Sequence, residues 1–189
     1  NDAVAISIYR PDVRLGFTLG LTATPSYASS IVTPDSPGNF SAQAGVFPGQ
    51  SALALWNFNY YVGWSSLAGA SGSFSARLLV DSDPSDAFNP VPAGGGIPIP
   101  LATDGALDPV GGLEQDSWNM GFSALLPFNQ FSPGAAGVYT FELDLLQSAQ
   151  VVARTLINVH VVASSVPEPS SLALLAAAML PFALRRRRK

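Results

Sequence analysis

Apolar and polar side chains alternate residue by residue over several stretches of this chain. Residues 138–146 show it most clearly, reading V-Y-T-F-E-L-D-L-L. The apolar side is formed by Tyr139, Phe141, Leu143 and Leu145, and the polar side by Thr140, Glu142 and Asp144. A period of two is the spacing of a β-strand with one face in a core and the other toward water. Residues 13–21, 52–62 and 150–162 follow a similar pattern, so half-buried strands are predicted throughout.

These strands predict an all-β fold. Seven or eight short strands are expected, over residues 3–9, 13–21, 52–62, 72–81, 117–122, 138–146 and 150–162. The connections are rich in glycine and proline (17 and 16 residues), and residues 22–38 and 82–114 are expected to be loops. No helical period precedes residue 171. We therefore predict an antiparallel β-sandwich, Ig-like or jelly-roll-like, formed by residues 1–165 as an extracytoplasmic domain.

Charge and composition exclude several functions. The chain has no cysteine and one histidine, so disulfides, thiolate metal sites and multi-histidine sites are excluded. Residues 1–165 contain twelve acids and four arginines, a net charge of −8. A body of this charge without a basic patch is unsuited to nucleic acid, because phosphate contacts require Lys and Arg.

The C-terminal segment combines an apolar run with a basic end. Residues 172–184 carry no charge, and as a helix they would be roughly 20 Å long, shorter than the ~30 Å hydrocarbon core of a bilayer. A short C-terminal hydrophobic helix that anchors only transiently is therefore predicted. Its main membrane residues are Leu172, Leu174, Leu175, Leu180, Phe182 and Leu184. The basic stop that keeps the terminus cytoplasmic is Arg185, Arg186, Arg187 and Arg188.

A rigid tetrapeptide, Val166-Pro167-Glu168-Pro169, stands just before this run. Two prolines around one residue keep the segment extended, where an enzyme at the membrane surface could reach it. The whole of residues 166–189 resembles the PEP-CTERM sorting signal. The resemblance implies that Pro167, Glu168 and Pro169 are recognised by an exosortase-like membrane enzyme that removes the tail. It also implies an exported protein of a Gram-negative bacterium that makes extracellular polysaccharide.

The body of the chain, residues 1–165, gives less information about function than the tail does. Its segments W-N-F-N-Y and Q-D-S-W-N-M-G-F are similar to those of uncharacterised PEP-CTERM proteins, and the same tail has been labelled an ice-binding-protein C-terminal domain. At the N-terminus, residues 10–28 are a weak signal-peptide candidate. Two early strands of the mature domain, with the signal peptide upstream of Asn1, are the favoured interpretation.

No catalytic set of residues is apparent. His160 alternates with core valines and is expected to face solvent. Glu142 and Asp144 share one face of a strand, as a pair of hydrolytic acids would, but a solvated strand face is the favoured interpretation. We therefore expect no enzyme activity and no obligatory cofactor.

Two binding hypotheses stay open for the body. Asp81, Asp83 and Asp86 could supply oxygen ligands to calcium, or could simply form turns. Tyr61 and Trp64 could be the exposed members of an aromatic platform for sugar rings, whereas Trp56 and Trp118 are expected in the core. The sequence thus predicts an exported cell-surface or matrix protein of unknown ligand, sorted through its tail. The alternative is a carbohydrate- or ice-binding module with the same tail.

Overall fold

The computed structural model describes residues 3–11, 15–27, 30–66, 74–85, 87–88, 90, 96–99, 101, 112–122 and 131–163. Within these residues the secondary structure consists of strands, without a helix. In chain order the strands are β1 (Val4–Arg10), β2 (Leu15–Pro25), β3 (Val32–Ser36), β4 (Asn39–Gln43), β5 (Val46–Phe47), β6 (Gln50–Ala54), β7 (Trp56–Ser66), β8 (Phe74–Val80), β9 (Ile97–Ile99), β10 (Gly112–Trp118), β11 (Gly137–Gln147) and β12 (Gln150–Val162).

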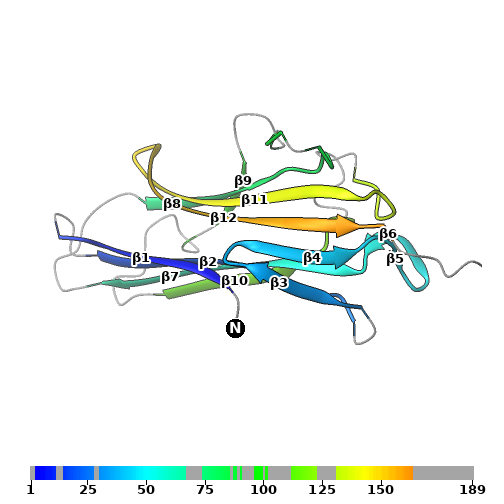
Figure 1. The fold of residues 1–189 in the computed structure, drawn as a ribbon. Helices are drawn as coiled ribbons and strands as arrows, with labels where there is room; N and C mark the ends of the chain where they lie inside the picture. The colour runs from blue at the N-terminus through cyan, green and yellow to red at the C-terminus, as the bar shows by residue number, and fades with distance from the viewer. Residues whose placement is uncertain are drawn as a thin grey trace, which may run out of the picture.

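Two sheets lie face to face (Figure 1). Sheet A has the order β1-β2-β7-β10, sheet B has the order β3-β4-β12-β11-β8-β9, and β5 and β6 form a separate hairpin. The predicted all-β sandwich is therefore confirmed. One pairing corrects the expectation of a purely antiparallel fold, because β4 runs parallel to β12. The predicted C-terminal helix lies outside the described residues.

The core forms where the alternating apolar faces of the two sheets meet. Trp56, Phe58 and Tyr60 on β7 are buried, while the asparagines between them point outward. The rings of Phe58 and Phe141 stack across the sheets with centroids 4.3 Å apart. The four apolar residues predicted on β11 are each fully buried. The period-two pattern therefore identified the inner faces correctly.

Several strand boundaries differ from the predictions. Residues 22–38 were expected to be a loop, but β2 continues to Pro25 and β3 occupies Val32–Ser36. Pro34 is tolerated there because β3 is the edge strand of its sheet. The strand expected at residues 117–122 instead ends at Trp118, and β10 begins at Gly112, inside the stretch predicted as loop. Most residues of β10 are exposed, so its sequence lacks a clear apolar period. Backbone pairing with β7 holds it in the sheet.

Candidate functional site

The chain leaves the sandwich from a central strand. β12 lies between β4 and β11 in sheet B, and it ends at Val162, whose carbonyl accepts a hydrogen bond from the Ala44 amide at 2.8 Å. Figure 1 shows β12 pointing toward the end of the molecule that holds the β5–β6 hairpin. The tail that follows is thus attached to a strand paired on both sides, which holds its base firmly.

The residues predicted to carry sorting follow shortly after β12. The tetrapeptide from Val166, the apolar run and the arginines all lie outside the described residues. Among the residues that are described, no helix is long and apolar enough to cross a membrane. The membrane part of the tail therefore stays a prediction from its sequence.

Tyr61 and Trp64, the predicted sugar platform, lie on opposite faces of β7. The register of β7 against both neighbours is unbroken, so residues three apart point to opposite sides. Tyr61 is on the outer face and 39% exposed, whereas Trp64 packs against the core with its indole nitrogen buried. Both residues nevertheless line one hollow, and of the two Tyr61 is the more exposed.

A hollow of about 320 Å³ lies beside Tyr61. It opens where glycines leave space in sheet A, and its lining includes Gly16 and Gly63 as well as Ser7 and Thr18, whose hydroxyls are 3.0 Å apart. A Cβ at Gly63 would collide with the Tyr61 ring, so this ring lies flat along its own strand. Sugar binding here, by Tyr61 and Trp64, stays a prediction.

The predicted calcium ligands occupy the turn after β8. Asp81 is buried and its carboxylate accepts the Asp83 amide at 3.1 Å, while the Asp83 carboxylate accepts the Ser85 amide at 3.1 Å. Asp86 lies outside the described residues. Within the parts of the chain that the structure describes, no group of three or more acidic or histidine side chains is close enough to hold a metal ion. These two hydrogen bonds are of the kind that forms turns, and calcium binding stays a prediction.

Asp83 also lies close enough to act on a core tyrosine. Burial, with a smaller contribution from the Asp83 charge, raises the pKa of Tyr139 to about 12. The Tyr139 hydroxyl donates to the Ala135 carbonyl at 3.2 Å. The phenol is therefore neutral and serves as a structural donor at the start of β11.

An ion-pair cluster covers the outer face of sheet B. Asp144 is fully buried, and register places it directly between Arg77 on β8 and Arg154 on β12. Arg77 donates to one carboxylate oxygen through Nε at 3.0 Å and Nη2 at 2.9 Å, and Arg154 Nε donates to the other at 2.8 Å. A second acid, Glu142, accepts from Arg154 Nη2 at 3.0 Å.

The cluster corrects the prediction that Glu142 and Asp144 lie on a solvated strand face. Both are buried, because long side chains from the two neighbouring strands lie over the central strand. Burial first and the Asp144 charge second raise the pKa of Glu142, and the two arginines only partly oppose this. Two carboxylates matched by two guanidinium groups leave the cluster electrically balanced, as a structural role requires.

Sequence reasoning missed this pairing. Arg77 and Arg154 enter the sequence-based prediction only as charges, yet each stands in the polar phase of its predicted strand. Because basic and acidic side chains on adjacent strands pair when they are opposite each other, these phases were the available signal. His160, by contrast, is on the outer face as predicted, with Nε2 3.5 Å from Asn39 Oδ1.

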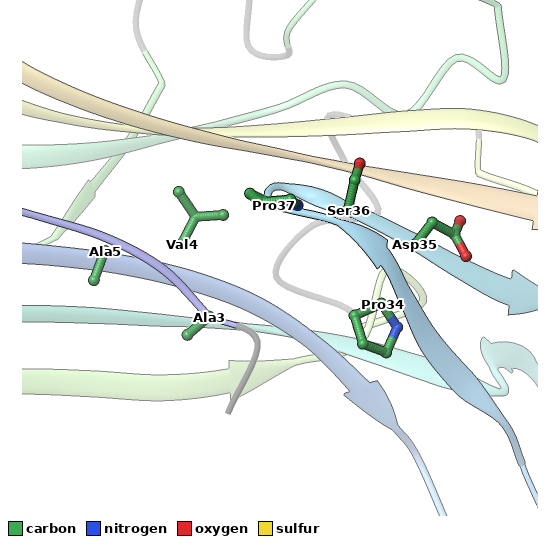
Figure 2. A pocket seen from close by; sticks show the side chains of 7 residues that line it. All are labelled: Ala3, Val4, Ala5, Pro34, Asp35, Ser36 and Pro37. Carbon is green, nitrogen blue, oxygen red and sulfur yellow. The ribbon is translucent and has the colours of Figure 1, made fainter.

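A larger hollow of about 520 Å³ separates the edges of the two sheets. Figure 2 shows its lining, with Ala3, Val4 and Ala5 on one side and Pro34 to Pro37 on the other. It lies between β1 at the edge of sheet A and β3 at the edge of sheet B. Its one charged lining residue among those described, Asp35, already accepts the Ser41 hydroxyl at 2.6 Å. No ligand chemistry follows from this lining.

The fold and the attachment of the tail define an all-β body with a C-terminal extension, and the extension has a recognised type. Residues 165–188 match the PEP-CTERM protein-sorting motif. The C-terminal segment is therefore a PEP-CTERM sorting signal, which implies export, membrane-associated sorting and processing by an exosortase-type enzyme. No curated protein and no solved structure matches the chain.

Proposed function

We propose that this chain is an exported protein of two parts. Residues 1–165 are the functional body, and residues 166–189 are a sorting tail that an exosortase-type enzyme removes at the membrane. The observation that carries the proposal is the order of features within the matched motif: Pro167-Glu168-Pro169, the apolar run and the four arginines. A rigid extended segment at the membrane surface is accessible to a processing enzyme, and a short apolar run is a weak anchor.

The body acts without catalysis, as a cell-surface or extracellular-matrix component of a Gram-negative bacterium. In support, the sequence supplies a single histidine and no cysteine, and its best-placed pair of carboxylates is neutralised by arginines. A polysaccharide of the matrix is the partner class that export of this kind favours. The exposed Tyr61 and its hollow are the first place to look for such a contact.

The test is the C-terminal mass of the mature protein. The full chain is expressed in a host that contains the processing enzyme, as wild type and as the Pro167→Ala/Pro169→Ala variant. The matched control carries the same exchange at two exposed body prolines, Pro34→Ala/Pro37→Ala. We expect the wild type and the control to lose the tail and the motif variant to keep Lys189. Intact termini in all three proteins would contradict the proposal.

A further inference from the structure

One end of the sandwich differs from the rest of the surface in composition. We define the exit end as the described residues 26–27, 30–31, 43–52, 119–122, 131–136 and 162–163. Contacts hold these segments together: the Gly45 amide donates to the Pro133 carbonyl at 2.8 Å, and the Tyr27 and Phe47 rings meet edge to face at 4.9 Å. A Cβ at Gly121 would collide with the Ala52 carbonyl, so these two segments also touch.

The exit end is uncharged and apolar. None of its residues is Asp, Glu, Lys or Arg, although residues 1–165 as a whole have a net charge of −8. Four of its apolar side chains are exposed: Ile31 at 57%, Val46 at 49%, Phe122 at 39% and Val162 at 52%. Asp81 and Asp83 flank it, beside Thr140 and Tyr139. Exposed apolar residues gathered where charge is missing are typical of a surface that meets a partner.

The tail begins at this same end. Val162 is the last residue of β12, and Ala163 follows it at the exit end. Residues 164–171 separate Ala163 from Leu172, the first residue of the apolar run. A fully extended chain of that length spans at most about 29 Å. With the run inserted in a bilayer, the exit end is thus confined to the layer next to the membrane.

We propose that the exit end rests on the lipid–water interface while the tail is inserted. This rests on the proposed function, since it requires the tail to enter a membrane. The absence of charge fits a surface that buries apolar side chains among headgroups, and the Tyr27–Phe47 pair is of the type enriched at that depth. Because the exposed residues, two of which lie in strands, come from separate segments rather than from one concave site, a planar deformable partner fits them better than a protein.

The contact also gives the body a fixed orientation. With the exit end on the bilayer, the long axis of the sandwich points away from the membrane (Figure 1). The body then holds the start of the tail next to the membrane, close to Pro167 to Pro169. The body would thereby position its own sorting motif for processing.

The experiment uses the full chain in phosphatidylcholine vesicles that contain some lipid with a nitroxide quencher on the headgroup. The chain has no cysteine, so a single introduced cysteine carries a fluorophore at a known place. Val46→Cys and Val162→Cys report on the exit end. Leu113→Cys and Val151→Cys, at 52% and 41% exposed, are matched controls toward the opposite end. The fluorescence of labels that enter the headgroup layer should fall about twofold or more, and the fluorescence of the control labels should not fall.

A further variant separates contact from mere tethering. Ile31→Ser/Phe122→Ser removes apolar contact without touching the core, because both side chains are exposed. With the label at position 46, we expect this variant to lose most of the quenching while it still floats with the vesicles. Equal quenching in the variant and its parent would overturn the proposal, since the tail alone would then explain proximity.

The other outcomes of this experiment distinguish failure of the membrane contact from failure of the proposed function. If the chain does not float with vesicles, the membrane insertion of the tail fails, and with it the proposed function. If the chain floats but exit-end and far-end labels behave alike, only the present inference fails. If the exit-end labels are shielded from solvent only when the vesicles contain the processing enzyme, the exit end binds protein, and the lipid proposal is overturned.

Discussion

Replacing Asp144 with asparagine should weaken this fold more than any comparable change of an exposed acid. The Asp144 carboxylate is fully buried and receives hydrogen bonds from two guanidinium groups on the strands to either side. The substitution Asp144→Asn keeps the size of the side chain, so it leaves the packing of sheet B unchanged. It removes the negative charge and turns one acceptor into a donor that faces Arg77 or Arg154.

The magnitude follows from the bonds lost and the solvent that remains. Three of the four hydrogen bonds to Asp144 are 3.0 Å or shorter. A bond to a charged group contributes about 1.5–3 kcal/mol, and asparagine can keep roughly half of the set. Arg77 and Arg154 are 25% and 50% exposed, so water partly replaces what they lose. We therefore expect a loss of about 2–3 kcal/mol, or roughly 5–10 °C in Tm for a domain of this size.

Urea unfolding of both proteins measures this loss. The control is Asp35→Asn, the same chemical change at an exposed carboxylate that accepts one hydroxyl hydrogen bond. It should cost under about 1 kcal/mol. In the double variant Asp144→Asn/Arg154→Gln, the two losses should not add, because one removes the partner of the other. An Asp144→Asn protein as stable as the control would refute the argument that the buried ion pairs stabilise sheet B.

Three further predictions concern the body. Because burial and the Asp144 charge raise the pKa of Glu142 above its ordinary value of 4.5, the native state keeps this proton when the unfolded chain has lost it. The free energy of unfolding therefore falls as the pH rises from about 4.5 through the raised pKa. Glu142→Gln should make this fall less steep, as urea midpoints measured against pH would show. A pH dependence that is unchanged in the variant contradicts the prediction. Asn119→Ala should cost about 3 kcal/mol of stability, because the buried side-chain oxygen of Asn119 accepts hydrogen bonds from the Ala54 and Gly121 amides at 2.9 and 3.1 Å. Asn119→Asp should cost at least as much. Thermal melts check both variants, and a loss under about 1 kcal/mol would rule out this structural role. The calcium hypothesis predicts that millimolar calcium raises Tm and that Asp83→Asn abolishes the rise; no rise in the wild type ends it.

Local pattern predicted the strands whose inner faces are apolar. The apolar residues expected on the inner faces of β7, β11 and β12 are buried, although Glu142 and Asp144 on the other face of β11 are buried as well. β3 and β10 were missed or misplaced because they lie at sheet edges and bury little, so their sequences carry a weak period. The candidate site residues divide in the same way. His160 follows the phase of its strand, whereas the paired roles of Arg77 and Arg154 depend on which strands become neighbours.

The sequence alone determined that this chain is a β-protein with a sorting signal at residues 165–188, because alternation and a contiguous motif are local properties of the chain. Only the tertiary structure decided that β4 lies parallel to β12, that Asp144 is buried between two arginines, and that the tail leaves from an uncharged end. These features join residues far apart in sequence. Which of them meet depends on how strands pair across long connections, and no local period specifies that pairing.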